Sequence, residues 1–520
     1  MIQNEKVKVR RAVNNVSIVM VLTLLSKFFG FARDIVLANF YGATNVSDAF
    51  FISLTIPELA YSLVAQAIAV GFIPIFIEIM HHEGEDKAND FTNKVLTMAY
   101  FFSAFLLIIA NLFPKEITSF FARGFDEPTI SLTSDFIKIT TLSLFLKGTS
   151  SVLCSYCQAK GEFTRPALIG LPYDIIIIIS IYISYKFNVL FLAYGTVFAY
   201  ASQIFLTIPY CYKSGYRQKL TFNRHDTNIK KIIALFLPVM LGVGANQINI
   251  FVDRMLASTI AVGGISALNY ANKIGNVMEN IIVLSIASVM YPVFSSSAVK
   301  NDYKSLTYHL QVTLDTIMLL IIPITVISIV FAEPIITFLF SRGAFDMNAV
   351  ELTTSAMIYY SVGMIGVSFR VILTRAFYAL RDVKTPVVNA TIAVIINVVL
   401  NFYLSKYMGI GGLALASSIA SLSCSLLMLL ELIRRIGFNC QLVILHGIKT
   451  FITSGIMGAI IALVYRLLIN NEFNYIWALC LSVTLGIIIY IGLALLFQLP
   501  GTGIFVKIVR DKLLFLKSIL

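Results

Sequence analysis

Charged residues are scarce in this chain. Only 13% of its 520 residues are Asp, Glu, Lys or Arg, whereas 58% are hydrophobic. A soluble domain of this length needs a larger polar fraction to cover its surface, so the composition excludes an ordinary soluble protein. Because no long polar stretch separates the apolar runs, we expect one membrane domain without a separate soluble module.

Motifs of enzymatic chemistry are also missing. The sequence contains no P-loop, no His-Glu-x-x-His, no Gly-x-Ser-x-Gly and no repeated aspartate motif of a membrane glycosyltransferase. Cys154-x-x-Cys157 lacks a second cysteine pair or nearby histidines, so we expect no metal and no cofactor. Without a nucleotide site, the energy for transport would come from a coupling ion, the membrane potential or removal of the product.

The apolar runs predict an all-α membrane protein. About twenty residues are needed to cross the hydrocarbon core, and about fourteen such runs fit. The predicted spans lie near 14–40, 48–80, 92–113, 130–158, 166–185, 188–211, 231–259, 264–297, 307–331, 349–380, 386–405, 409–434, 447–468 and 474–498.

The net charge of +12 fits a membrane topology. The basic residues neither cluster on one face nor interleave with stackable aromatics, so nucleic acid is not an expected partner. With the N-terminus inside, most Lys and Arg fall in cytoplasmic loops, including 213–231 and the pair Arg434 and Arg435. We therefore expect a multi-pass protein with both termini in the cytoplasm, and an amphipathic tail, 501–520, lying at the headgroups.

Several motifs recur at an offset of about 220 residues. Arg123-Gly-Phe-Asp126 returns as Arg342-Gly-Ala-Phe-Asp346, and the turn at 158–166 returns as the turn at 378–386. An even number of spans in each half gives parallel repeats, and in transporters of this kind the substrate site lies between the halves. The predicted domains are lobes 1–225 and 226–440, two extra helices in 441–500 and the tail 501–520.

Eight cations fall inside the predicted spans, where each costs roughly 2.5 to 3.5 kcal/mol unless it faces protein or water. They are Lys27, Arg33, Lys138, Lys147, Arg254, Lys273, Arg370 and Arg375. For Lys138, Lys147, Arg370 and Arg375 we expect a structural role, such as snorkelling or an i, i+3 pair between Asp135 and Lys138.

The remaining cations lie on the first two helices of each half. Lys27 and Asp34 are seven residues apart and project from nearly one helix face, Arg33 points elsewhere, and Gly30 permits a bend. A cavity lined by such cations and amides suits a phosphate-bearing substrate. The other polar residues on these helices are Asp48, Asp253, Arg254, Asn269, Asn272, Lys273, Asn276 and Glu279.

Lys27, Arg33, Asp34, Asp48 and Lys273 belong to motifs that resemble the MurJ (MviN) lipid II flippase family, of the multidrug, oligosaccharidyl-lipid and polysaccharide exporter superfamily. The motifs run through the whole chain, and they are 26–34, 41–43, 48–51, 71–74, 270–273 and 377–386. The resemblance implies a fourteen-helix transporter in the bacterial cytoplasmic membrane. It also implies that spans 13 and 14 form a groove for the lipid tail.

The resemblance also implies a substrate and its contacts. The substrate would be the undecaprenyl-pyrophosphate-linked peptidoglycan precursor, moved to the outer leaflet by alternating access, with membrane lipids and the cell-wall synthesis machinery as partners. Ser26, Arg33, Asp34 and Asp48 match the family directly. Lys27 and Lys273 stand where the family usually has arginine. Lysine keeps the positive charge but cannot form the two parallel hydrogen bonds that a guanidinium donates to a phosphate.

Three departures keep other functions open. The family pattern Leu-Arg-Arg-x-Phe-Ala-Glu-Gly reads here as 60–67 without its two cations and its acid, Asn276 replaces a glutamate, and 386–405 has no carboxylate. An exporter of another polyprenyl-linked glycan, of the capsule, teichoic-acid or O-antigen type, is therefore the main alternative. An ion-coupled small-molecule antiporter and an enzyme are weaker ones.

The topology can be tested with reporters. A reporter fused after Leu520, or inserted at Lys219, should report the cytoplasm, whereas one near Phe125 or Phe345 should report the outside, because Lys and Arg favour cytoplasmic loops. Protease protection in spheroplasts would check the same sites. An external C-terminus would contradict the predicted number of spans.

Overall fold

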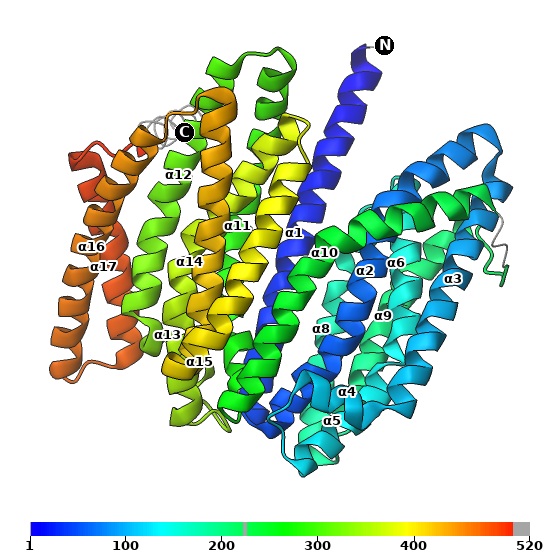
Figure 1. The fold of residues 1–520 in the computed structure, drawn as a ribbon, viewed down its shortest axis with the longest axis horizontal. Coiled ribbons are helices and arrows are strands. Elements are labelled where there is room, and N and C mark those ends of the chain that lie inside the picture. Colours follow the sequence, from blue (N-terminus) through cyan, green and yellow to red (C-terminus); the bar gives the residue numbers. More distant parts are fainter. Residues whose placement is uncertain (1, 222–225, 503–520) are drawn as a thin grey trace. The chain divides into compact units, whose positions relative to one another are not determined.

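The computed structural model describes residues 2–221 and 226–502, and each regular element in these residues is a helix (Figure 1). The helices are α1 Ile2–Tyr41, α2 Asn45–His82, α3 Glu85–Leu112, α4 Pro114–Phe121, α5 Glu127–Thr140, α6 Ser143–Ala159, α7 Thr164–Leu168, α8 Gly170–Lys186, α9 Phe191–Lys213, α10 Thr227–Ile260, α11 Gly264–Val299, α12 Tyr303–Val330, α13 Ala332–Phe340, α14 Met347–Ala379, α15 Lys384–Ile436, α16 Cys440–Asn470 and α17 Tyr475–Leu496.

Each predicted span falls on a helix or on two consecutive helices. Among the described residues, nine helices are long and apolar enough to cross a membrane, and ten if α5 and α6, which meet at 40°, count as one span. Helix α15 holds two predicted spans, and Gly409 interrupts it with φ 55° and ψ −132°, which glycine adopts readily. The all-α membrane fold is confirmed, while the number fourteen stays a prediction.

The helices pack into two compact units. Unit 1 contains Met1–Ser266 with Arg342–Asp346, and unit 2 contains Ala267–Ser341 and Met347–Leu520. Helix α10 belongs to unit 1 because it packs along α2, where the Gln247 side-chain amide donates to Ser62 Oγ at 2.8 Å. These units divide the chain at 266/267, whereas the sequence repeat predicts lobes that meet at 225/226. The predicted lobes stay a prediction.

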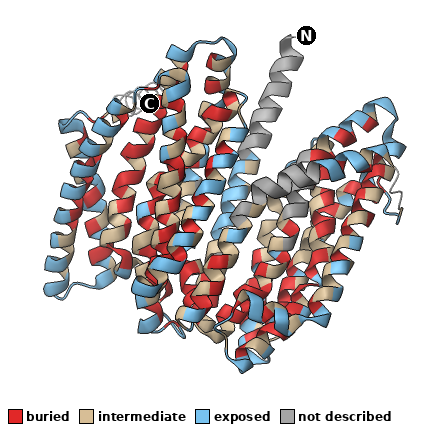
Figure 2. Ribbon diagram, in the orientation of Figure 1, coloured by how far each residue is buried: buried red, intermediate tan, exposed pale blue. Residues whose placement is uncertain are grey.

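Each unit has its own core of buried residues, which Figure 2 marks in red along the helices. In unit 1, the Phe72 ring lies 5.5 Å from the rings of both Phe76 and Phe91, which joins α2 to α3. In unit 2, Leu314 of α12 and Ile372 of α14 are fully buried. Since lipid is as apolar as these side chains, close packing rather than the hydrophobic effect holds the helices together within the membrane.

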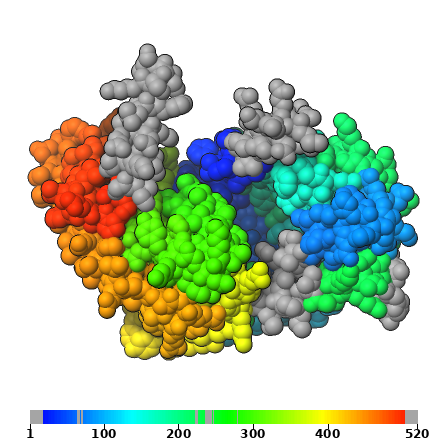
Figure 3. Space-filling view, turned by 90° about the horizontal axis from the view of Figure 1, so that it is seen from above, coloured from blue at the N-terminus to red at the C-terminus, as the bar shows by residue number. Residues whose placement is uncertain are grey.

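Helices α16 and α17 lie side by side at the edge of unit 2 (Figures 1 and 3). His446 Nδ1 of α16 is hydrogen-bonded to Asp315 Oδ2 of α12 at 3.0 Å, and the Tyr490 hydroxyl of α17 donates to the Leu319 carbonyl at 2.7 Å. Their outward residues, such as Trp477, are apolar and exposed, as suits contact with lipid. Residues 503–520 of the predicted amphipathic tail lie outside the described residues.

The two repeated Arg-Gly loops follow the short helices α4 and α13, and both lie in unit 1. The Gly124 amide donates to Ser258 Oγ at 3.2 Å, near the end of α10. The Ala344 amide donates to the Asn39 carbonyl at 2.9 Å, near the end of α1. A Cβ on Gly343, whose φ is +59°, would lie 2.2 Å from that carbonyl oxygen. A Cβ on Gly124 would likewise lie 2.0 Å from the Ser258 carbonyl oxygen. Each loop therefore contacts a helix of the other predicted lobe, and both contacts leave no room for a side chain.

Gly343→Ala should sharply lower the amount of folded protein, because it adds a backbone clash to the strain of a positive φ. Gly161→Ala is the matched control, since Gly161 has φ +82° and a Cβ added there would meet no atom within 4 Å. The control should lose only about 1 kcal/mol. Membrane abundance and the melting temperature in detergent would be compared, and equal losses would exclude the clash.

Candidate substrate-binding site

Arg33 lies at the centre of a buried ion-pair group in unit 1. Its Nη2 lies 2.8 Å from Asp34 Oδ1 on α1, and its Nη1 lies 2.9 Å from Asp174 Oδ1 on α8. The Asp34 and Asp174 side chains are 1% and 9% exposed, and Arg33 is 20% exposed. In a medium of low dielectric, one guanidinium between two carboxylates is strongly held, so the charge of Arg33 is already largely compensated.

Asp174 is a residue that the sequence analysis did not single out. It is the one acidic residue between Arg165 and Lys186, inside a predicted span. An ionisable residue within a span is functional or paired by default, and that rule could have found it. Its partner on another helix, 141 positions away, could not be found from one sequence.

Small residues bring α1 and α8 together at this group. A Cβ on Gly30 would lie 3.3 Å from Asp174 Oδ2, and a Cβ on Gly170 would lie 2.5 Å from Ser26 Oγ. Helices in membranes approach closely where such small residues meet. Helix α1 continues through Gly30, where the glycine leaves room for the neighbouring carboxylate, and the bend that Gly30 permits stays a prediction. Ser26 is half-buried against α8.

Lys27 and Asp34 do not share an environment, although their spacing predicts nearly the same face. Lys27 is exposed, whereas Asp34 is covered and turned toward Arg33. The difference arises because α8 covers α1 around Asp34. Lys27 is therefore the more accessible of the two cations that the sequence analysis placed on this helix.

Asp48 and Arg254 connect α2 to the region around α10 and the start of α11. The Asp48 carboxylate is 1% exposed and accepts hydrogen bonds from the Gly263 amide at 2.9 Å and the Ser266 amide at 2.8 Å. The Ser266 hydroxyl donates to it as well. Arg254 Nη1 donates to the Phe51 carbonyl at 2.7 Å. Both residues thus hold backbone in the described conformation.

The predicted residues of unit 2 form a polar stripe on α11. Asn269, Asn272, Lys273 and Asn276 follow i, i+3, i+4, i+7 spacing, which places them on one helix face. The Asn276 amide donates to Asn272 Oδ1, and both residues are exposed, whereas Asn269 and Lys273 are half-buried. Buried Tyr270, at the flank of this stripe, packs against Phe340, with ring centroids 5.1 Å apart.

The cations expected to be structural have several kinds of partner. Lys138 Nζ lies 3.2 Å from Asp135, which confirms the predicted i, i+3 pair, and the Arg375 guanidinium lies over the Tyr291 ring at 5.7 Å. Lys147 Nζ lies 5.5 Å from the ring centroids of both Tyr61 and Tyr200. Tyr61 occupies the place of the first arginine in the family pattern for the second span.

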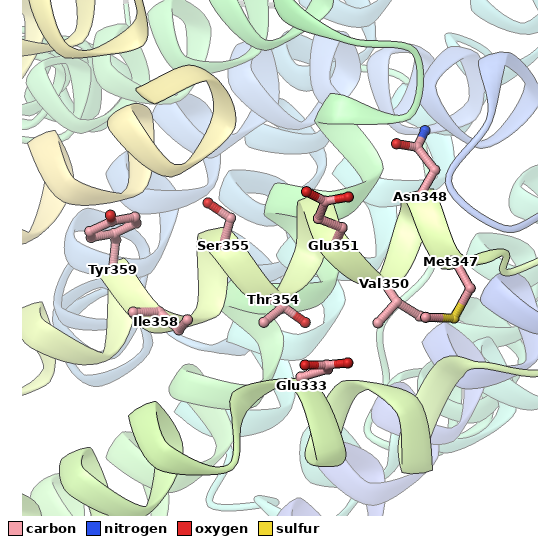
Figure 4. Close-up of a pocket in the computed structure, with 9 residues that line it drawn as sticks. All are labelled: Glu333, Met347, Asn348, Val350, Glu351, Thr354, Ser355, Ile358 and Tyr359. Carbon is pink, nitrogen blue, oxygen red and sulfur yellow. The ribbon is translucent and has the colours of Figure 1, made fainter. Parts of the chain in front are cut away.

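Two cavities of unit 2 hold none of the predicted site residues. One, of about 620 Å³, lies between α13 and α14, and Figure 4 shows Glu333 and Glu351 among its lining residues. Two carboxylates would repel a phosphate, so this cavity does not suit the expected headgroup.

The other cavity, of about 420 Å³, lies beside the family-like motif 377–386, called the signature motif below, and its lining includes Lys384, Arg434 and Arg435. Arg435 Nη1 lies 2.6 Å from Asp382 in the loop before α15. Burial tends to raise the pKa of Asp382, but hydrogen bonds from Thr385 and the charge of Arg435 outweigh it and hold that pKa below its ordinary value. The signature motif therefore forms a turn fastened to the end of α15.

Arg33→Ala should destabilise unit 1 by about 3 to 5 kcal/mol, because it leaves two buried carboxylates without their cation. The double variant Arg33→Ala/Asp174→Asn should regain part of that stability, since one uncompensated charge is removed. Thermal unfolding in detergent would measure both. Arg33→Ala with unchanged stability would show that the ion pairs contribute little.

The chain matches the family model described as "Lipid II flippase MurJ" over residues 37–488. It is 29% identical over 413 residues to the probable lipid II flippase MurJ of Buchnera aphidicola subsp. Acyrthosiphon pisum, covering 78% of this chain and 80% of the relative. It is 27% identical over 504 residues to the probable lipid II flippase MurJ of Rickettsia prowazekii, covering 94% of this chain and 96% of the relative.

Solved structures agree with this match. A structure described as lipid II flippase MurJ in an inward closed conformation has a TM-score of 0.80 at 26% identity, covering 92% of this chain and 98% of that one. An inward-facing MATE family transporter of the MOP superfamily has a TM-score of 0.70 at 15% identity, covering 82% of this chain and 98% of that one. At this identity the likeness supports the fold alone. This chain therefore belongs to the MurJ family of lipid II flippases, and it is a multi-pass membrane transporter rather than an enzyme.

Proposed function

We propose that this chain moves lipid II, the undecaprenyl-pyrophosphate-linked peptidoglycan precursor, from the cytoplasmic to the outer leaflet by alternating access. The match to the flippase family over residues 37–488 carries this proposal. We infer further that the chain lies in the bacterial cytoplasmic membrane with both termini inside and works beside the cell-wall synthesis machinery. Its coupling ion, or its use of the membrane potential, stays a prediction.

Lys27 and Lys273 are the best candidates to contact the diphosphate. Lys27 is exposed, so it can present its charge to a ligand, and Lys273 lies on the polar stripe of α11 with Asn272 and Asn276. Arg33 is held by two carboxylates, and one arm of Arg254 is bonded to backbone, so these two arginines suit positioning better than direct contact. An ammonium binds phosphate as a point charge, which tolerates the varied approach of a moving headgroup.

The amides of α11 suit the uncharged parts of the headgroup. Asn272 and Asn276 are exposed one turn apart, and each amide can both donate and accept hydrogen bonds. A sugar or peptide presents the complementary groups. Asn276 therefore keeps hydrogen bonding at the position where the family has a glutamate, without adding a negative charge near the phosphates.

An exporter of another polyprenyl-linked glycan has less support. The departures in 60–67 remove cations but leave the diphosphate candidates Lys27 and Lys273 in place. The relatives from Buchnera and Rickettsia both carry the lipid II flippase name. An antiporter or an enzyme finds no support in these relatives.

Expression of this chain should rescue bacteria depleted of their own lipid II flippase and return lipid II to the outer leaflet. Lys273→Gln should lower transport by roughly 10- to 100-fold, because a charge-assisted bond contributes about 1.5 to 3 kcal/mol. Labelling of outer-leaflet lipid II by an impermeant reagent would measure transport per molecule of protein.

Lys138→Gln is the control, since Lys138 forms an exposed ion pair that contributes little. It should transport normally. Normal membrane abundance with lipid II confined to the inner leaflet would contradict the proposed function, and restoration of a different surface polymer would favour the alternative exporter.

A further inference from the structure

Lys147 is a membrane-embedded cation held by aromatic rings. It lies on α6, and its ammonium lies 5.5 Å from the ring of Tyr61 on α2 and 5.5 Å from the ring of Tyr200 on α9. The ion pairs of the described residues, which extend to 4.0 Å, do not include Lys147. The sequence analysis assigned this residue a structural role.

Ring faces and carboxylates hold a cation in different ways. A carboxylate neutralises the charge, as Asp34 and Asp174 do for Arg33, whereas a tyrosine ring attracts an ammonium through its quadrupole and leaves the net charge in place. Lys147 is half-buried, so its ammonium is partly accessible. An ammonium held by rings, without a carboxylate in direct contact, attracts an anion in a medium of low dielectric.

The tyrosines connect Lys147 to the Arg33 group. The rings of Tyr200 and Tyr173 are 4.9 Å apart, and Tyr173 directly precedes Asp174 on α8. Tyr173 lies within electrostatic range of both Arg33 and Lys147. Tyr173 and Tyr200 are half-buried, and their contact links the ring that holds Lys147 to the helix that carries Asp174.

We propose that Lys147, positioned by Tyr61 and Tyr200, binds the diphosphate of the lipid-linked substrate within unit 1. This inference rests on the proposed function. The ligand class is a diphosphate ester, which needs a cation and neutral donors and would be repelled by unpaired carboxylates. Among the described residues no carboxylate lies within ion-pair distance of Lys147, and its two nearest partners are rings.

A purely structural role for Lys147 makes a different prediction. Arg33 carries one positive charge between two carboxylates, so Lys147 could serve to balance the remaining negative charge. In that case Lys147→Gln should lower the melting temperature, and Lys147→Gln/Asp174→Asn should restore it. In the ligand-binding role, Lys147→Gln folds normally and loses affinity.

The experiment uses the purified full-length chain in detergent with three probes: lipid II, undecaprenyl diphosphate and undecaprenol. Binding and melting temperature would be measured for the native chain, Lys147→Gln, Lys147→Arg and the control Lys138→Gln. We expect Lys147→Gln to weaken both diphosphate probes about 10- to 100-fold at an unchanged melting temperature. Lys147→Arg, which keeps the charge, should retain most of the affinity, and undecaprenol should be insensitive to all variants.

Two results would overturn the inference. In the first, Lys147→Gln binds both diphosphate probes with the affinity of the native chain. In the second, Lys147→Gln lowers the melting temperature, and adding Asp174→Asn restores it. The native chain tests the proposed function separately. If it binds undecaprenyl diphosphate through Lys147 but shows no preference for lipid II, the diphosphate site stands and lipid II as the substrate is contradicted.

Discussion

A charge inside a membrane must be compensated, and this requirement shapes unit 1. Arg33 joins α1 to α8 through Asp34 and Asp174, and glycines on both helices let the backbones come close enough for those bonds. Removing Arg33 leaves two buried carboxylates without their cation, which is far more costly than losing a surface ion pair. The position of α1, which also carries Lys27, depends on this group.

Two kinds of partner among the described cations leave different amounts of charge for a substrate. Arg33 and Lys138 are paired with carboxylates, whereas Lys147 lies between rings. A carboxylate partner cancels the positive charge, whereas a ring does not. The kind of partner therefore separates cations that hold helices from cations suited to an anionic headgroup.

Backbone contacts supply a second kind of constraint. The loop at 342–346 contacts Asn39, and Asp48 caps the amides of Gly263 and Ser266. The first contact leaves no room for a Cβ at Gly343, and the second buries the Asp48 carboxylate. Both contacts therefore stabilise the described conformation. A transporter that alternates between states has to break contacts of this type, and hydrogen bonds to backbone can re-form with water once exposed.

Hydropathy alone determines the all-α membrane fold, because lipid forces each span to satisfy its backbone bonds internally and so leaves a long apolar run as a signature. The break at Gly409 and the Asp135–Lys138 pair are also local, and local spacing predicts them. The pairing of Arg33 with Asp174 and the placement of Lys147 between Tyr61 and Tyr200 come from helices far apart in the chain. Tertiary packing alone decides them, since helical periodicity states which face a side chain occupies and not which helix covers that face.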